Sequence, residues 1–562
     1  GPWTGELSSS ALSTATAVTA LARVDPVGHA DLVRGGLRWL ADHANPDGGW
    51  GDTIRSRSNP STTALVWAAF GAADADATYP ATAAAAVDWL EHRLGPITSI
   101  VPAIEALYGK DRTFSVPITM TLALSGRLGP DGWARVRPLP FELAALPRSL
   151  FGALRLPVVS YALPALIAIG QVIHHRSGRF HPLRRLAKTR TLSVLEAIQP
   201  TNGGFLEATP LTSFVTMSLA GMGLADHVVA RRGVAFLRGS ARPDGSWPID
   251  TNLAAWVTTL AIQALRHHPE DLDGPRREAL RAWLLDGQYR DRHPYTGAAP
   301  GGWAWTPLPG GVPDADDTAG ALVALRLLGP PDPATADAAA RGVRWLLDLQ
   351  NRDGGIPTFC RGWGTLPFDR STPELTAHAL RAWQAWRPNL DPRLAARVDA
   401  ATGKAAAYLE RSQRRDGAWI PLWFGNEHAA DQENPVYGTA QVLRALPFVD
   451  GAEGTDREAM RQRAVGFLFR AQRGDGAWGG DADAPGSLEE TALACEALCR
   501  HPEFVSRRER ASEALLRFVE AEALPPATPI GLYFARLWYY ERLYPLIFAA
   551  SALGEMRGSD QR

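Results

Sequence analysis

The stretch RAVGFLFRAQRGDGAW, residues 463–478, combines helically spaced apolar side chains with an Asp-Gly pair and a final aromatic residue. Phe467 lies eleven residues before Trp478, and the same interval of eleven recurs along the chain. Self-similarity of this kind indicates a repeat architecture, in which each copy is one structural unit. The further copies are residues 34–50, 231–247, 341–356 and 404–419, with a weaker copy at 190–205.

Each copy predicts a helix, a tight turn and a second helix. The apolar residues before the turn have helical spacing, and the glycine of Asp-Gly or Asn-Gly can adopt the positive φ of a tight turn. The aromatic residue can then fold back onto the preceding helix, and a Gln before the turn can bond backbone groups at the next helix end. Because Ala- and Leu-rich segments follow and period-two alternation is almost absent, we predict an all-α fold with helix pairs stacked into toroids.

The bulk composition fits a globular protein of more than one domain. The chain has 562 residues, 46% of them hydrophobic, and a formal net charge of -1, so we expect at least two domains and no nucleic-acid partner. Three cysteines make no disulfide framework, and Cys495 and Cys499 share a helix face, where burial is favoured over metal binding. Together with a chain start that shows no secretory pattern, this predicts a reducing cytoplasm.

The most apolar stretch is LPVVSYALPALIAIGQVI, residues 156–173. It is just long enough to span a membrane, but it carries two Pro, a Gly, a Gln and a Ser. These residues favour a buried helix or an in-plane membrane patch over a span.

The segment GGWAWTPLPGGVPDADDTAG, residues 301–320, holds the candidate chemistry. Asp314, Asp316 and Asp317 crowd one turn, where they could simply cap a helix. Like charges this close cannot all ionise without a penalty, and the apolar sequence that follows draws the turn toward the core, so we expect one carboxyl to stay protonated at neutral pH. An acid of this kind beside Trp303 and Trp305 suits the protonation of an alkene, because aromatic faces stabilise the resulting carbocation.

These features together resemble the squalene–hopene cyclases and other class II terpene cyclases. The repeats are similar to the QW motif of that family, and DADD is similar to its DxDD acid motif. The resemblance implies that Asp316 donates the proton and that Asp314 and Asp317 are its supporting carboxylates. STPELTAHAL, residues 371–380, resembles the family stretch whose His assists the proton donor, which gives His378, with Glu374 one helical turn earlier on the same face.

The resemblance also implies a set of aromatic residues that bind substrate. GGWAW places Trp305 at the position of a cation-stabilising aromatic, and the chemistry needs no metal or organic cofactor. For each aromatic taken alone, core packing is the competing interpretation. The full set is Trp303, Trp305, Trp256, Phe359, Trp423, Tyr437, Tyr533 and Tyr540.

The chain departs from the family pattern in three places, which leaves substrate and product open. Thr121 stands near the position of a family cavity Trp, and a Gly-rich insertion of the family is missing before residues 180–182. The segment RGWGTLPFDR, residues 361–370, is also unlike the usual sequence.

We predict two α/α barrels with the active cavity between them. Residues 28–250 form the first barrel, with a membrane-facing apolar segment near 156–173, and residues 1–27 together with 251–562 form the second barrel, which carries the acid motif. The partners that the resemblance implies are a linear isoprenoid lipid as substrate, the inner leaflet of a membrane through monotopic contact, and a second copy of the chain in a homodimer.

The predicted function is protonation-initiated cyclisation of squalene, or of a related linear polyprenyl, to a polycyclic terpenoid. The closest alternative is a class II cyclase that converts a prenyl diphosphate to a bicyclic diphosphate, which would keep the acid and add a basic pocket. A metal-dependent synthase is disfavoured because no DDxxD motif is present, and a protein prenyltransferase would need a Zn site that is not evident. An inverting glycosidase would need two separated carboxylates. A non-catalytic helical-repeat scaffold predicts no closed cavity.

Overall fold

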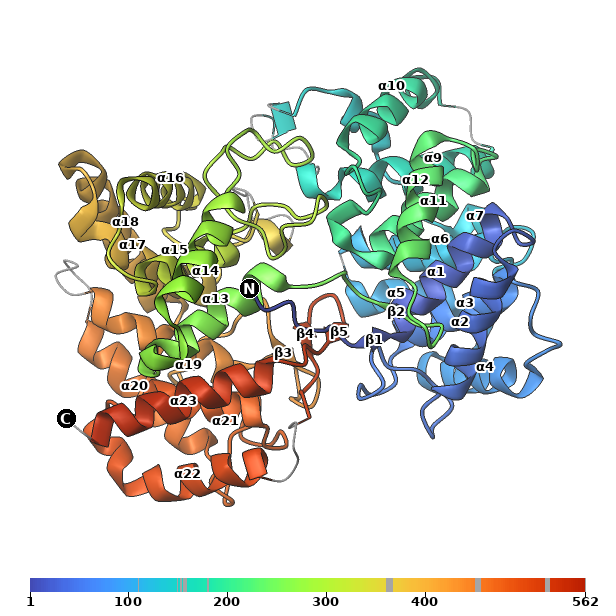
Figure 1. Ribbon diagram of the computed structural model, residues 1–562. Coiled ribbons are helices and arrows are strands. Elements are labelled where there is room, and N and C mark those ends of the chain that lie inside the picture. Colours follow the sequence, from blue (N-terminus) through green and yellow to red (C-terminus); the bar gives the residue numbers. More distant parts are fainter. Residues whose placement is uncertain are drawn as a thin grey trace.

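The computed structural model contains two helical lobes side by side, with the N-terminal segment running between them (Figure 1). Helices dominate and the strands are short, so the fold is all-α, as predicted. The structure describes residues 1–109, 111–148, 150–151, 154, 159–178, 181–359, 367–449, 456–520 and 526–560.

The first lobe is a barrel of two concentric layers of helices. Its inner helices are α1 (Ala11–Val24), α3 (Pro60–Ala72), α6 (Arg112–Leu124), α9 (Leu163–Ser177) and α11 (Thr209–Gly221), and each packs on the next, with α11 closing on α1. The short helix α7 (Gly132–Arg135) lies between α6 and α9. The outer helices are α2 (Ala30–Asp42), α4 (Pro80–Leu94), α5 (Ile100–Tyr108), α10 (Pro182–Ile198) and α12 (Val228–Ser240).

The second lobe repeats this arrangement with a larger ring. Its inner helices are α13 (Ala254–Ala264), α15 (Ala315–Leu327), α17 (Pro373–Trp386), α19 (Pro435–Ala445), α21 (Leu488–Leu498) and α23 (Tyr544–Asp560), and α23 closes the ring on α13. The outer helices are α14 (Gly274–Asp286), α16 (Pro333–Leu349), α18 (Pro392–Ser412), α20 (Arg457–Ala471) and α22 (Val505–Glu520). Two α/α barrels are therefore present.

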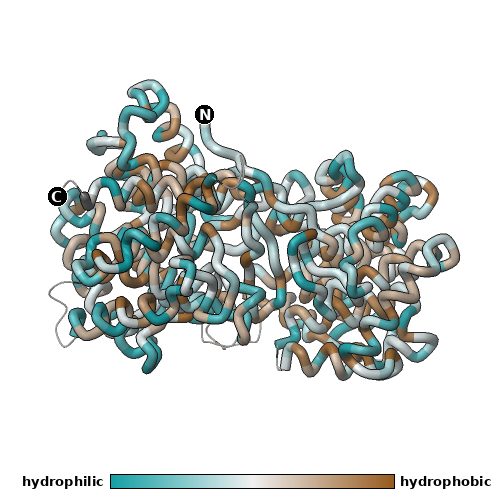
Figure 2. The backbone as a smooth tube through the Cα atoms, turned by 90° about the horizontal axis from the view of Figure 1, so that it is seen from below, coloured by the Kyte–Doolittle hydropathy of each residue, from teal (hydrophilic) through white to brown (hydrophobic). Residues whose placement is uncertain are grey.

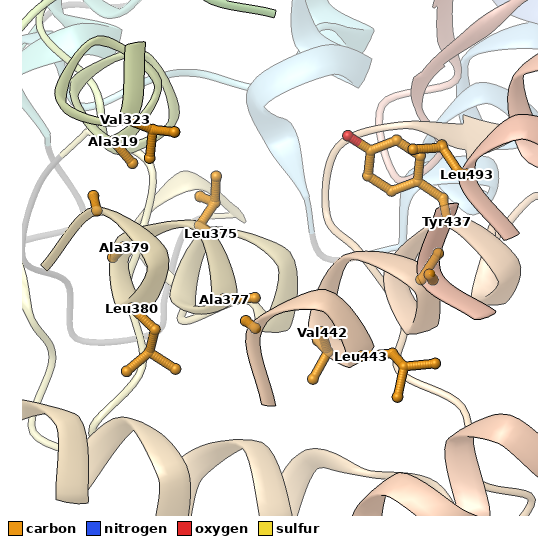
Figure 3. Close-up of a cluster of buried hydrophobic side chains, with 14 of the residues drawn as sticks. Ala319, Val323, Leu375, Ala377, Ala379, Leu380, Tyr437, Val442, Leu443 and Leu493 are labelled. Atoms are coloured by element: carbon orange, nitrogen blue, oxygen red, sulfur yellow. The ribbon is translucent and has the colours of Figure 1, made fainter. Parts of the chain in front are cut away.

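The two layers differ because their sequences differ. The outer helix α2 buries one stripe that includes Val33, Leu37 and Leu40, which is the pattern of an amphipathic surface helix. The inner helix α3 is buried at nearly every position, and it is apolar all round. Where inner helices meet, as in the cluster of α15, α17 and α19, alanines alternate with leucines and valines, and this lets the helices approach closely (Figure 3). Apolar segments accordingly lie mostly inside the lobes (Figure 2).

The predicted turn between the helices of a repeat is confirmed. In the copy at residues 463–478, the Trp478 indole donates a hydrogen bond to the Leu468 carbonyl at 2.7 Å, so the aromatic folds back on the preceding helix. Gly476 has a φ of 89°, the conformation that favours glycine. The amide of Gln413, in the preceding copy, donates both to the carbonyl of its own turn at 2.9 Å and to the Met460 carbonyl of the next outer helix at 3.0 Å.

The N-terminal segment joins the two barrels, and its path corrects the predicted domain boundary. Residues 1–27 were expected in the second barrel, but α1 is part of the inner ring of the first barrel and its core. The reason is that α1 is buried almost all round and can only be an inner helix. The residues before it do reach the second barrel: Trp3 exchanges hydrogen bonds with the Thr258 hydroxyl, and Ser8 N–H donates to the Tyr540 carbonyl at 2.9 Å.

The apolar stretch at residues 156–173 is a second correction. Residues 156–158 lie outside the described residues, and α9 is buried from Leu163 to Ile173, so this helix packs in the inner ring of the first barrel and offers no membrane-facing surface. In the part of the chain that the structure describes, no helix has the length and apolar character to cross a membrane.

Short strands close the gap between the barrels. Strands β1 (Ser9–Ser10) and β2 (Trp247–Pro248) pair antiparallel, and β3 (Gly425–Asn426), β4 (Ile530–Leu532) and β5 (Leu537–Tyr539) form a small antiparallel sheet. In this sheet Leu532 pairs with Leu537 across the β4–β5 hairpin. Both side chains face the cavity described below.

Candidate active site

The acid turn forms the N-terminus of α15, with Asp314 as its N-cap. The Asp314 side chain accepts hydrogen bonds from the backbone N–H groups of Asp316 and Asp317, each at 2.9 Å. The first amides of a helix have no partner within the helix, so a capping carboxyl satisfies them. Asp314 therefore meets the structural expectation for this turn and leaves the carboxyl of Asp316 free for another partner.

That partner is the predicted histidine. One oxygen of the Asp316 carboxyl lies 2.6 Å from Nδ1 of His378 on the neighbouring helix α17. Gly320 allows α15 to lie close to α13 on its other side, because a Cβ there would lie 2.8 Å from the hydroxyl oxygen of Thr259. Burial lowers the pKa of His378 and outweighs the opposite effect of its hydrogen bond to Asp316, so a neutral imidazole holds the carboxyl.

The two remaining acids of the turn are buried. Burial raises the pKa of Asp314 to about 8, and the nearby Asp316 adds to the effect. Burial also raises the pKa of Asp317 well above its usual range, with a further contribution from the negative charges of Asp314 and Asp316. The turn therefore holds neutral carboxylic acid at pH 7, as the crowding of like charges predicted.

Glu374 lies on the same helix as His378 but has a different contact. Its carboxyl accepts hydrogen bonds from the backbone N–H of Leu422 at 2.7 Å and of Trp423 at 3.2 Å. Burial raises the pKa of Glu374 to about 7. Its visible role is to anchor the loop that carries Trp423 over the acid turn.

The acid turn lies in the wall of a cavity of about 350 Å³ between the two barrels. This volume is in the range of small-molecule sites. Residues of both barrels line it, from Leu65 and Phe214 in the first to Trp256 and Tyr544 in the second, and Asp314, Asp316 and Asp317 are all part of the wall. The expected position of the cavity is thus confirmed.

The structure brings four of the predicted aromatics into this wall. They are Trp256, Trp305, Phe359 and Trp423. The Trp256 ring meets the His378 ring edge-on, with centroids 6.0 Å apart, and the Trp423 indole donates to the Thr358 hydroxyl at 3.1 Å. Aromatic faces therefore surround the space beside Asp316, which suits the stabilisation of a cation.

Tyr437 lies behind the acid and not in the main cavity. It lines a separate pocket of about 30 Å³, roughly one water molecule in size, together with Asp316, Glu374 and His378. Its ring stacks on Phe424 with centroids 4.5 Å apart. Tyr437 points away from the aliphatic side chains of its own helix α19 (Figure 3).

Three predicted substrate-binding residues are absent from the described wall of the cavity. Trp303 is buried in the core, where its indole donates to the Leu284 carbonyl at 2.7 Å like the other repeat tryptophans. Tyr540 lies under the guanidinium of Arg55, 4.9 Å from its ring centre. Tyr533 packs against Phe534 next to the cavity.

Other aromatics of the wall were missed. Tyr539 lines the cavity in place of Tyr540, because neighbouring residues of an extended segment point to opposite faces. Phe424 lines it beside Trp423, and its φ of 64° places its backbone in the left-handed region. The alternation of side chains along an extended segment could have predicted Tyr539. No sequence pattern predicts the positive φ of Phe424. The remaining missed aromatics are Tyr108, Phe114, Tyr161, Phe214, Phe368 and Tyr544.

A carboxylic acid held by a histidine, in an aromatic cavity between two α/α barrels, is the combination expected of a class II terpene cyclase. Residues 253–497 match the family model of the squalene-hopene cyclase C-terminal domain. This match confirms the resemblance found in the repeats and the acid turn.

Similar proteins include both kinds of cyclase considered above. The squalene–hopene cyclase of Alicyclobacillus acidocaldarius is 28% identical over 324 residues, which cover 50% of this chain and 46% of that protein. A drimenyl diphosphate synthase of Streptantibioticus cattleyicolor is 33% identical over 301 residues, which cover 50% of each chain. The alignments span about half the length or less of the curated relatives.

The fold also has a counterpart among solved structures. The ent-copalyl diphosphate synthase of Streptomyces platensis superposes with a TM-score of 0.62 at 21% identity, and the match covers 99% of this chain and 96% of that one. The whole chain therefore shares its two-barrel fold with that protein.

Proposed function

We propose that this protein is a class II isoprenoid cyclase in which Asp316 protonates the terminal alkene of a linear polyprenyl substrate. The observation that carries the proposal is the Asp316 carboxyl, fixed at 2.6 Å from His378 and facing a cavity lined by aromatic rings. The proton passes from the Asp316 oxygen to one alkene carbon, the π electrons form the new C–H bond, and the other carbon becomes cationic.

The surrounding residues prepare this step. His378 fixes the position of the Asp316 carboxyl, and its hydrogen bond stabilises the carboxylate that remains after proton transfer. Asp314 fixes the backbone of the turn, and Glu374 anchors the loop of Trp423. Trp305 and Trp423 line the cavity, and an aromatic ring whose face meets a cation can stabilise it by about 0.5–2 kcal/mol.

The substrate is proposed to be squalene or a related uncharged polyprenyl. Among the described residues that line the cavity there is no Lys or Arg, so nothing there pairs with a diphosphate. The second candidate is a prenyl diphosphate, favoured by the 33% identity to a drimenyl diphosphate synthase. Its diphosphate would have to lie beyond the apolar wall. The scaffold hypothesis gains no support, because it required that no closed cavity exist.

The test is product analysis by mass spectrometry. The protein in detergent and its Asp316→Asn variant are incubated separately with squalene, geranylgeranyl diphosphate and farnesyl diphosphate, without added metal. We expect a cyclic hydrocarbon or alcohol from squalene that is absent with the variant. A cyclised diphosphate would move the assignment to the second candidate, and no consumption of any of the three would contradict the proposal.

We further propose contact with the inner leaflet of a membrane, through exposed leucines on the first barrel. Leu183 and Leu186 on α10 are 64% and 79% exposed, and Leu154 nearby in the sequence is 59% exposed. Arg185 and Lys188 on the same helix supply positive charge that attracts anionic lipid. α10 lies at the outer edge of its lobe (Figure 1) and packs on α9, whose residue Ala165 lines the cavity.

Vesicle sedimentation tests this contact. With vesicles that contain anionic lipid, we expect Leu186→Glu to lower the bound fraction and Leu516→Glu, an exposed leucine on the second barrel, to leave it unchanged. Equal binding by both variants would contradict the proposed surface. The homodimer that the resemblance implies stays a prediction, which sedimentation velocity in detergent checks.

A further inference from the structure

A fourth carboxyl lies in the cavity wall, away from the acid turn. Asp250 belongs to the segment between β2 and α13, and it lines the cavity together with Ile249 and Leu253. The residue keeps part of its surface accessible, but Oδ1 is buried and has no hydrogen-bond partner among the described residues. Most buried polar atoms in proteins are paired, so an unpaired carboxyl oxygen in a substrate cavity calls for a functional reason.

The backbone around Asp250 is fixed by contacts with its neighbours. The Thr209 N–H donates to the Ile249 carbonyl at 3.1 Å, and Asp250 forms an isolated bridge with Ala208. Glu207 accepts the hydroxyl of Thr251 at 2.9 Å and the N–H of Gly310 at 2.7 Å. Glu207 is thus used to hold the segment, and this leaves Asp250 facing the cavity.

The surroundings of Asp250 make it a strong base. Burial raises its pKa well above the usual range, and the charge of Glu207 adds to the effect. The Trp305 indole N–H faces this carboxyl and acts in the opposite direction. A cation formed beside Trp305 favours release of the Asp250 proton to water, because opposite charges in a dry site attract strongly and the cation stabilises the carboxylate.

Building on the proposed function, we propose that Asp250 is the base that ends the cyclisation by taking a proton from the final carbocation. The C–H bond next to the cationic carbon breaks, its electron pair becomes the new C=C bond, and the proton passes to a carboxylate oxygen of Asp250. Asp316 has supplied one proton at the start, so the product is an isomer of the substrate. The proton that Asp250 released to water replaces the one that Asp316 gave up, and Asp250 ends the cycle protonated, as it began.

The other polar groups of the wall are poorer candidates. The hydroxyls of Ser61, Thr113 and Thr358 line the cavity but are weak bases. Asp314 is the helix cap and Asp317 is its buried neighbour. Asp250 is the carboxyl of the described wall that has no part in initiation, and it stands beside the aromatic ring of Trp305.

The experiment separates substrate consumption from product identity. The wild-type protein, Asp250→Asn and the control Asp348→Asn, which changes an exposed acid of the second barrel, are incubated with each substrate named above. Remaining substrate and the ratio of products are measured by gas chromatography and mass spectrometry. A general base accelerates proton transfer by about 10²–10⁴-fold, so we expect the wild-type alkene to fall at least about tenfold relative to other products in Asp250→Asn while substrate is still consumed.

The outcomes are distinguishable. A wild-type protein that consumes no substrate would overturn the proposed function and this inference with it. Consumption with the same product ratio in Asp250→Asn and wild type, or a wild-type product that is solely an alcohol, would overturn the inference alone. Should Asp250→Asn fail to fold, Asp250→Glu and Asp250→Ser serve in its place. The first keeps a displaced carboxyl and is expected to change the position of the double bond, and the second is expected to lose the alkene.

Discussion

The start of helix α15 and the start of helix α21 carry the same pattern of residue types, a capping residue, an apolar residue, two acids and a threonine. The first reads Asp-Ala-Asp-Asp-Thr from Asp314 to Thr318, and the second reads Ser-Leu-Glu-Glu-Thr from Ser487 to Thr491. In both helices the first residue is the N-cap, and the threonine hydroxyl accepts the N–H of the repeat tryptophan at 3.0 Å. Two acids occupy the second and third helical positions in each case.

The acids of α21 are used for structure. Glu489 accepts the N–H and the hydroxyl of Thr528, at 2.7 and 3.0 Å. Glu490 accepts the side-chain amides of Asn426 and Asn434, at 2.9 and 3.0 Å. These carboxyls tie loops to the helix and are removed from any cavity chemistry.

Helix α17 explains the comparison. Glu374 stands at the same second position, and like Glu489 it accepts backbone N–H groups of a loop. Asp316 has the shorter side chain and is bonded instead to His378, in the wall of the cavity. The same position of the repeat therefore carries a carboxyl that anchors a loop in α17 and α21, and the proposed proton donor in α15. The two cases differ in the group that contacts the carboxyl.

The largest expected difference between these positions is in catalysis. Asp316→Asn removes the transferable proton, and because an acid contributes about 10²–10⁴-fold, we expect the cyclisation rate to fall by that factor. Glu489→Gln, the matched change in α21, leaves the acid turn intact and should keep the wild-type rate. The measurement is the initial rate of product formation. A comparable loss of rate in both variants would contradict the different roles given to Asp316 and Glu489.

The second prediction concerns how the stability of the folded protein depends on pH through the anchoring carboxyls Glu374 and Glu489. The pKa of Glu374 is raised by burial to about 7, so the folded protein holds this proton more tightly than the unfolded chain does. The resulting stabilisation is complete below about pH 4.5 and is lost as the pH rises through about 7, with an upper limit of about 3 kcal/mol.

Glu374→Gln cannot ionise and should lack this dependence. Its thermal midpoint, measured relative to wild type, should therefore rise between pH 5 and pH 8. Glu489→Gln should behave in the same way, since burial also raises the pKa of Glu489 to about 7. Parallel curves for wild type and both variants would show that neither carboxyl is protonated in the folded state.

The smallest expected difference separates the two acids at the third position. Glu490 accepts several hydrogen bonds, so Glu490→Gln should reduce stability by about 1–2 kcal/mol. Asp317 is already held neutral by burial, and an amide of similar size can donate to Asp314 in its place. Asp317→Asn should thus leave the thermal midpoint unchanged, and a loss as large as that of Glu490→Gln would contradict this account.

The features that could be predicted from the sequence are those set by local patterns. The interval of eleven residues predicted the helix, the turn and the aromatic contact correctly, because all three lie within one repeat. The acid turn could be placed at a helix start from Asp314 alone. Its pairing with His378 came from the resemblance, and α15 and α17 are indeed adjacent inner helices.

The features that could not be predicted depend on distant parts of the chain. Tyr161 lines the cavity from the first barrel. Asp250 lines it from a segment that Glu207 holds in place by accepting a hydrogen bond from the Thr251 hydroxyl. Trp303 was placed in the cavity by its nearness to the acid turn, yet its indole is committed to the repeat contact. The place of α1 in the first barrel was missed because ring closure depends on α11, some 200 residues further along.

The joining of residues 5–10 to residues 540–542 has a consequence for synthesis in the cell. Ser8 is bonded to Tyr540 in both directions, and Glu6 accepts the N–H of Arg542. At a translation rate of about 5–20 residues per second, the first of these partners waits roughly half a minute to two minutes for the second to leave the ribosome. Strand β1 can pair with β2 during that time, but Glu6 and Ser8 have no partner until the end of the chain has been made. A nascent-chain partner that covers these residues would therefore act before the two barrels are joined.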